Sequence, residues 1–185
     1  LALLVAKVVR NTAAGLIDAA WVWCRSERFF DGRLKISGAE LITASANSSS
    51  GTLLVSPHFT SLELYPVILA RLGIDFAVTY RPSDDPYLRD FVDRGRLRYG
   101  PIIPVRSMRR IVKELSTGSL VWMAPDQDSG KKGAVVSPFF GVPTYTVATV
   151  SRLIAMTDAE PLLASLSYEA GCYHLKVERM RTVFE

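Results

Sequence analysis

The sequence predicts one α/β domain with a mainly parallel, twisted β-sheet and helices on both faces. Short, continuously apolar segments such as residues 52–56 and 119–124 are typical of strands buried on both sides. Segments with helical periodicity separate these strands, as in repeated βαβ units. Glycines at the ends of the helical segments provide the expected stop signals. At 185 residues, the chain is long enough for one domain with a substantial core.

The elements alternate along the chain. The periodicity predicts helices over residues 1–24, 61–72, 85–99, 107–115 and 145–157, the third with Asp85 as N-cap. It predicts strands over residues 32–38, 52–56, 74–80, 101–105, 119–124, 161–168 and 172–177. Residues 43–51, rich in Ala, Ser and Asn, are expected to form a loop. We find no internal repeat and no second domain.

The N-terminal segment does not have the composition of a spanning helix. Lys7, Arg10 and Asp18 interrupt its apolar residues, whereas a spanning helix needs about 20 apolar residues in a row. A helix packed on the domain is favoured over one lying at a membrane interface. Because the chain starts at Leu1, we expect residues 1–185 to be a fragment that lacks an N-terminal membrane anchor.

Composition narrows the class of protein without naming a function. The net charge of +4, from 22 basic and 18 acidic side chains, suits an anionic partner such as a lipid head group, an acidic carrier protein or nucleic acid. Charged residues make up 22%, and 49% are hydrophobic, so disorder is excluded. Cys24 and Cys172 form no CxxC motif and indicate neither a zinc site nor a disulfide framework.

Polar residues follow three of the predicted strands. His58 follows the strand over residues 52–56, Arg81 follows the next one, and Asp126 follows the strand over residues 119–124. Ligands of parallel sheets bind outside the carboxyl ends of the strands. We therefore expect these side chains to line one crevice.

Within that crevice, His58 and Glu63 are candidates for acid–base chemistry. A carboxylate on one imidazole nitrogen fixes the tautomer and raises the basicity of the other nitrogen, as a general base requires. The alternative is that Thr60 and Glu63 form a capping box for the following helix and that His58 is a core histidine. From the residues alone both interpretations stay open. His174 lies in an alternating strand and is expected to be structural.

Other catalytic signatures are missing from the sequence. It contains no G-x-S-x-G elbow, no Walker loop and no GxGxxG after a strand. Two histidines and scattered carboxylates make no recognisable metal-ligand set. The Gly-Lys-Lys-Gly segment at residues 130–133 is more typical of a solvated turn than of a phosphate site.

Several motifs resemble one enzyme family. They are the HxxxxE motif of residues 58–63, Tyr-Arg-Pro at 80–82, Arg-Gly-Arg at 94–96, Ala-Pro-Asp-Gln-Asp-Ser-Gly at 124–130 and Ser-Pro-Phe-Phe-Gly-Val-Pro at 137–143. In this order and at these separations they resemble the lipid A late acyltransferases, over about residues 36–177. The HxxxxE motif alone is shared with glycerolipid acyltransferases, so the resemblance also implies a fold like theirs.

The resemblance implies transfer of an acyl chain from acyl carrier protein to a hydroxyl of a lipid A precursor. His58 and Glu63 match the family's general-base pair, and Arg81, Arg96 and Asp126 match further positions that bind substrate or stabilise the transition state. No metal, no other cofactor and no covalent acyl-enzyme is implied. The expected location is the cytoplasmic face of the bacterial inner membrane, with a membrane glycolipid as acceptor. Pro57 departs from the small or polar residue that many members have before the histidine.

Other functions remain as alternatives. The acceptor could be a glycerolipid or a phosphatidylinositol mannoside, and a scaffold without activity is disfavoured by the presence of both His58 and Glu63. A basic nucleic-acid-binding domain is a different class, and we expect no nucleic acid because the aromatic residues lie mostly in apolar segments. The stripe of Arg106, Arg109, Arg110 and Lys113 is a candidate docking surface for an acidic carrier protein, or a solubilising face.

Overall fold

The structure is a computed structural model, which describes residues 2–24, 27–46, 50–127, 130–131 and 133–180. Asp128, Ser129 and Lys132, which belong to two of the motifs above, lie outside the described residues.

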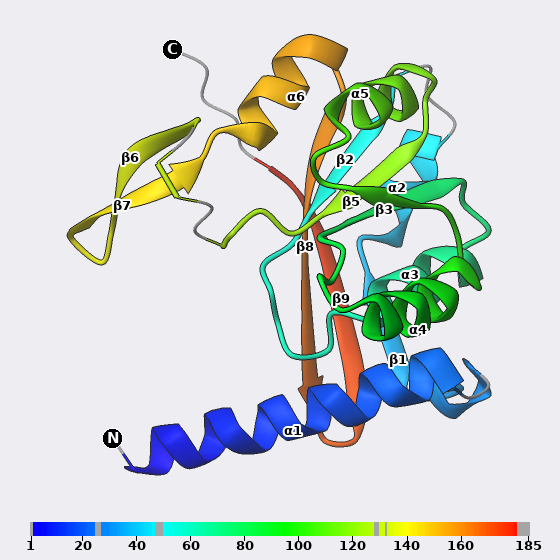
Figure 1. The fold of residues 1–185 in the computed structure, drawn as a ribbon. Coiled ribbons are helices and arrows are strands. Elements are labelled where there is room, and N and C mark those ends of the chain that lie inside the picture. Colours follow the sequence, from blue (N-terminus) through cyan, green and yellow to red (C-terminus); the bar gives the residue numbers. More distant parts are fainter. Residues whose placement is uncertain (1, 25–26, 47–49, 128–129, 132, 181–185) are drawn as a thin grey trace.

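A seven-stranded, mostly parallel sheet forms the centre of the fold, as expected (Figure 1). Its strand order is β1 (Leu34–Ser37), β9 (Cys172–Arg179), β8 (Glu160–Glu169), β2 (Thr52–Val55), β5 (Leu120–Met123), β3 (Phe76–Tyr80) and β4 (Ile102–Pro104). Only the β8–β9 pair is antiparallel. Two residues at positive φ, Ala170 and Gly171, join these strands, and so tight a turn leaves no room for a crossover helix.

Helices cover both faces of this sheet, which confirms the predicted layering. They are α1 (Ala2–Cys24), α2 (Ala39–Ala46), α3 (Leu64–Arg71), α4 (Pro86–Leu97), α5 (Met108–Ser116) and α6 (Thr149–Thr157), with a 3₁₀ turn at Glu27–Phe30. Leu54 of β2 points into a cluster with residues of α1, α2 and α3, whereas Leu53 and Val55 point into a cluster with α5 and α6. This alternation is the period-2 geometry of a strand buried on both sides.

One helix was missed by the sequence-based prediction, and one helix boundary differs. Helix α2, which the sequence analysis did not predict, extends to Ala46 and so into the expected loop, and the Thr43 hydroxyl donates to the carbonyl oxygens of Ala39 and Glu40. Helix α3 begins at Leu64 rather than at residue 61, because residues 60–63 form a turn. The predicted N-cap of α4 is confirmed: the Asp85 carboxylate accepts from two backbone amides of the first turn.

The helix predicted over residues 145–157 is wrong in its first part. Strand β7 (Val142–Val147) pairs antiparallel with β6 (Ala134–Phe139), and only the remainder is helix α6. Phe140 and Gly141 form the two-residue turn with positive φ at both positions, and β-branched residues occupy half of the strand positions. This hairpin stands apart from the main sheet (Figure 1).

Helix α1 packs on the domain through its second half, where Asp18, Ala19 and Val22 are buried. Its first half leaves apolar side chains such as Leu4 and Val9 exposed. Among the described residues, no helix is both long enough and apolar enough to cross a bilayer.

Candidate active site at the carboxyl edge of the sheet

The strand order brings the polar residues that follow three of the strands to one edge of the sheet. Strand β5 lies between β2 and β3 and is parallel to both, with Val55 beside Met123 and Val78 beside Trp122. The segments that follow these strands therefore leave from the same edge, and they carry His58, Arg81 and Asp126. For His58 and Asp126 the expected convergence is confirmed by direct contact.

His58 and Asp126 form a two-point contact. The backbone amide of His58 donates to Asp126 Oδ2 at 2.8 Å, and His58 Nδ1 makes a short hydrogen bond with Asp126 Oδ1. The side chains remain 33% and 42% exposed, so the pair faces solvent. An imidazole held through Nδ1 by a carboxylate carries its proton on Nδ1 and presents an unprotonated Nε2. This is the arrangement that a general base needs.

The Asp126 carboxyl is tuned to stay ionised. Partial burial opposes the charged form, but the hydrogen bonds from the His58 side chain and backbone outweigh it and hold the pKa of Asp126 below its ordinary value. A carboxylate at this position therefore carries its negative charge at neutral pH.

Glu63 lies in a different network. Its Oε2 accepts from Arg96 Nε at 3.0 Å and from Trp23 Nε1 at 3.0 Å, and its Oε1 pairs with Arg96 Nη2. The side chains of Arg96 and Glu63 are only 16% and 13% exposed, so this two-point ion pair is largely withdrawn from water. The direct pairing of His58 with Glu63 stays a prediction, and the carboxylate that contacts the imidazole in this structure is Asp126.

The capping-box interpretation of Glu63 is wrong. Glu63 is itself the N-cap residue of α3, and its side chain makes no capping hydrogen bond. The capping box would require Thr60 at the N-cap and Glu63 three residues later. Since the helix begins at Leu64, that spacing does not occur, and the carboxylate serves Arg96 and Trp23 instead.

The two arginines differ in their surroundings. Arg96 of α4 lies on the Glu63 carboxylate, and its guanidinium carbon is 5.7 Å from the centre of the Tyr80 ring. The Tyr80 hydroxyl in turn donates to Asp93 Oδ2 at 3.1 Å. Arg81 follows β3 and is exposed at the sheet edge. Arg96 is thus held in a largely buried ion pair, whereas the Arg81 side chain is exposed to solvent.

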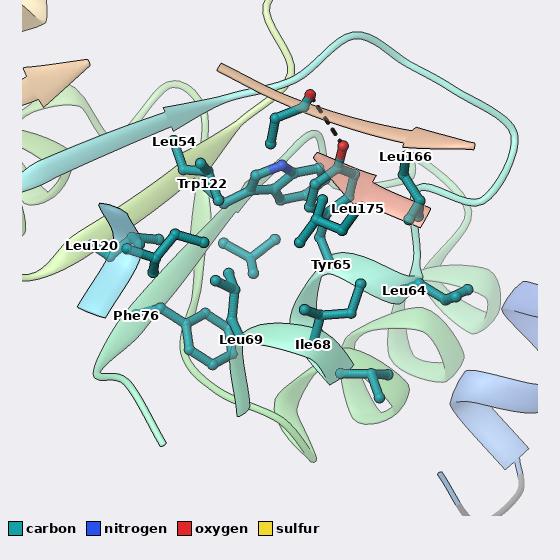
Figure 2. Packing of buried hydrophobic residues seen from close by; sticks show 14 of the residues in the cluster. Leu54, Leu64, Tyr65, Ile68, Leu69, Phe76, Leu120, Trp122, Leu166 and Leu175 are labelled. Atoms are coloured by element: carbon teal, nitrogen blue, oxygen red, sulfur yellow. Dashed lines mark hydrogen bonds between the residues drawn. The ribbon is translucent and has the colours of Figure 1, made fainter. Parts of the chain in front are cut away.

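A rigid apolar layer lies beneath the site. The Trp122 ring stacks on Tyr65 with 5.1 Å between centroids, and its Nε1 donates to the hydroxyl of buried Ser56 at 3.0 Å. The Tyr65 hydroxyl donates to the carbonyl of Ala164 at 3.2 Å (Figure 2). Ser56 lies two residues before His58, so this layer fixes the end of β2 from which His58 emerges.

The sequence-based reading did not assign Trp23 and Asp18 to the site. Trp23 donates to Glu63, and Asp18 accepts from Ser61 in the turn between His58 and Glu63. The sequence signal for Asp18 is a single carboxylate in the apolar second half of this helix. His174, predicted to be structural, lies on β9 and lines a surface hollow of about 370 Å³ with Lys35 and Lys176.

The described residues contain no cluster of three or more His, Cys, Asp or Glu side chains arranged to hold a metal ion. The site residues predicted from the sequence place one imidazole, two carboxylates and two guanidiniums in this part of the molecule.

Comparison with known proteins supports the resemblance stated above. The sequence profile of the family described as "Bacterial lipid A biosynthesis acyltransferase" matches residues 2–179. The chain belongs to this family. It is 31% identical over 165 residues to the lipid A biosynthesis palmitoleoyltransferase of Escherichia coli K12, an alignment that covers 86% of this chain and 52% of that protein.

Two further relatives carry related names. A lipid A biosynthesis acyltransferase of Haemophilus influenzae is 32% identical over 144 residues, covering 77% of this chain and 45% of the relative. The lipid A biosynthesis lauroyltransferase of Escherichia coli K12 is 29% identical over 153 residues, covering 82% and 50%. The chain thus spans about half the length of the curated relatives that it matches.

Proposed function

We propose that this chain carries the catalytic centre of an acyltransferase that moves a fatty acyl chain from acyl carrier protein to a hydroxyl of a lipid A precursor. The observation that carries the proposal is the hydrogen bonding of His58 to Asp126 at the carboxyl edge of the sheet. Family membership over residues 2–179 supports the class of reaction and the lipid acceptor.

The reaction follows from the chemistry of these groups. His58 Nε2 removes the proton of the acceptor hydroxyl, and Asp126 stabilises the imidazolium that forms. The hydroxyl oxygen attacks the thioester carbonyl, which becomes a tetrahedral oxyanion. When this intermediate collapses, the carbon–sulfur bond breaks, and the imidazolium returns its proton to the departing thiolate. The products are the ester and the free carrier thiol, without a cofactor or a covalent acyl-enzyme.

The roles of the other site residues follow from their contacts. Arg81, exposed at the sheet edge, is the candidate donor to the oxyanion or to an acceptor phosphate. Arg96 holds Glu63 and so fixes the turn that follows His58. In this arrangement Glu63 is a second carboxylate near the base, with the pairing to His58 predicted from the motif as the alternative.

We place the enzyme at the cytoplasmic face of the inner membrane, where a glycolipid acceptor is accessible. The exposed apolar side chains on the first half of α1, together with Lys7 and Arg10, have the composition of a segment that lies on an anionic lipid surface. Sedimentation with vesicles containing phosphatidylglycerol tests this placement: Leu4→Asp with Val9→Asp should abolish co-sedimentation, and unchanged binding would contradict it.

The catalytic proposal is tested by expressing the full-length protein and its His58→Ala variant in a bacterium deficient in late acyltransferases. Mass spectrometry of lipid A should show an added acyl chain with the parent protein and none with the variant. Equal amounts of folded protein, measured by immunoblot and by protease resistance, are the control. Full acylation by the variant would refute the role of His58, and acylated glycerolipid without acylated lipid A would favour the alternative acceptor.

A further inference from the structure

The turn between His58 and Glu63 is held from outside by helix α1. We define residues 57–63 as the His58 corner. Gly15 of α1 approaches it so closely that a Cβ on this residue would lie 2.2 Å from the carbonyl oxygen of Thr60. A contact below 3.0 Å to backbone cannot be relieved by a side-chain rotation. Only glycine therefore permits this distance between α1 and the His58 corner.

One turn further along α1, Asp18 binds the next residue of the corner. Asp18 is 7% exposed, and its Oδ2 accepts from the hydroxyl of Ser61 at 2.9 Å. Its Oδ1 accepts from the hydroxyl of Tyr173 in β9 at 2.5 Å. The same carboxylate thus joins the His58 corner to the sheet. Burial, followed by this hydrogen bond, raises the pKa of Tyr173 well above its ordinary value, so the hydroxyl stays a donor.

The end of α1 makes the third contact, at the far side of the corner. Trp23 Nε1 donates to Glu63 Oε2 at 3.0 Å. The indole is wedged against α4, because a Cβ on Gly95 would lie 2.6 Å from Trp23 Cγ. The hydroxyl of Tyr99 and the guanidinium of Arg98 donate to the carbonyls of Val22 and Trp23, which ties the end of α1 to the segment after α4.

A buried carboxylate in the packed part of α1 is costly unless it is hydrogen-bonded, and apolar residues would serve packing better. The two hydroxyls that donate to Asp18 belong to the His58 corner and to β9, which are distant in sequence. The hydrogen bond between Asp18 and Ser61 is the second of three successive contacts that α1 makes with the His58 corner. Asp126 contacts the corner at His58, and α1 contacts it from Thr60 onward. Together they restrain the backbone at His58 and the turn that follows it.

We infer that Asp18 is a positioning residue for the reaction: through Ser61, and with Gly15 beside it, it holds the His58 corner so that the imidazole meets the acceptor hydroxyl. The inference rests on the proposed function, because it assigns the corner to catalysis. A displacement of about 1 Å in a reacting group costs up to roughly 100-fold in rate. Loss of one hydrogen bond permits a smaller shift, and we expect about a tenfold effect.

The test uses Ser61→Ala in the full-length protein, with Thr79→Val as matched control. Ser61 and Thr79 are both 6% exposed, and each hydroxyl makes one buried hydrogen bond, Ser61 to Asp18 and Thr79 to the Trp122 carbonyl. Ser61→Ala should lower kcat about tenfold with unchanged KM for both substrates. Thr79→Val should lower the melting temperature by about as much as Ser61→Ala does, but it should keep kcat within twofold of the parent.

A second measurement follows the imidazole directly. Residues 1–185 contain two histidines; in ¹⁵N-histidine-labelled protein, the ring signals that disappear in His58→Ala belong to His58, and those that disappear in His174→Ala belong to His174. In Ser61→Ala and Gly15→Ala the His58 ring signals should shift, and those of His174, on β9, should not. If Gly15→Ala fails to fold, Asp18→Asn, which keeps the side-chain size, replaces it.

The inference is overturned if Ser61→Ala keeps kcat within twofold and its His58 ring signals coincide with those of the parent. It is also overturned if Thr79→Val lowers kcat as much as Ser61→Ala, since the effect would then reflect general loosening. His58→Ala, assayed beside them, separates the two proposals: if it retains full activity, the proposed function fails, whatever the ring signals show.

Discussion

Replacing Asp126 with asparagine tests which carboxylate assists His58. In the parent protein one carboxylate oxygen accepts from the His58 amide and the other binds Nδ1. Asparagine has one acceptor oxygen and one donor group. If its oxygen keeps the backbone contact, its NH₂ group points at Nδ1 and forces the imidazole proton onto Nε2, which then no longer accepts a proton. In the opposite orientation the NH₂ group faces the backbone N–H of His58, and because both groups are donors the backbone hydrogen bond is lost.

The magnitude follows from the exposure of the pair. Two unit charges about 4 Å apart interact by about 1 kcal/mol in water and about 4 kcal/mol at the effective dielectric of a protein surface. Since the side chains of His58 and Asp126 are 33% and 42% exposed, the loss of electrostatic stabilisation of the imidazolium lies between these limits, at roughly 2–3 kcal/mol. At 1.36 kcal/mol for each factor of ten, this predicts a fall in kcat of about 30- to 150-fold, with the unfavourable tautomer adding to it.

The assay measures initial rates of the purified full-length protein with acyl carrier protein as donor and a lipid A precursor as acceptor. Glu63→Gln is assayed beside Asp126→Asn, because the two variants remove one charge each from different networks. A fall of at least 30-fold for Asp126→Asn and a smaller one for Glu63→Gln is the expected result. A change of less than threefold for Asp126→Asn, with a large loss for Glu63→Gln, would refute this reasoning and favour the His58–Glu63 pair.

Three further predictions concern other parts of the molecule. Arg81→Ala should raise KM for a phosphorylated acceptor if the guanidinium clamps phosphate, or lower kcat if it stabilises the oxyanion; unchanged constants would place it outside the reaction. Because the basic side chains of α5 are exposed opposite buried Ile111, Arg109→Glu with Arg110→Glu should raise KM for acyl carrier protein and flatten its salt dependence, with transfer from acyl-coenzyme A retained. Equal losses with both donors would contradict docking. Burial raises the pKa of Tyr65 to about 12, so its contribution to stability is complete below pH 10 and is lost as pH rises toward 12. Between pH 8 and 11, the free energy of unfolding of Tyr65→Phe, measured with urea, should therefore fall by about 1.4 kcal/mol less than that of the parent. An equal fall in both proteins would contradict this assignment.

The sequence by itself determined the layering of the fold and the edge at which the site lies. Apolar segments that alternate with amphipathic helices have few stable arrangements, and parallel strands send their following segments to one edge. His58, Arg81 and Asp126 could therefore be assigned to a common edge without coordinates. The signals failed where two patterns overlapped, as at residues 145–147, where a strand of the hairpin precedes α6 and the local composition suits either state.

Only the tertiary structure decided which carboxylate contacts the His58 imidazole and which contacts the Arg96 guanidinium. Glu63 is five residues from His58 and Asp126 is 68 residues away, yet the strand order places β5 directly beside β2 and brings Asp126 to the imidazole. Arg96, 33 residues from Glu63, takes that carboxylate instead. Asp18 likewise meets Ser61 across 43 residues. Spacing along the chain limits only local pairs, whereas contacts between distant segments depend on the order and packing of whole elements, and these the periodicity of the sequence does not specify.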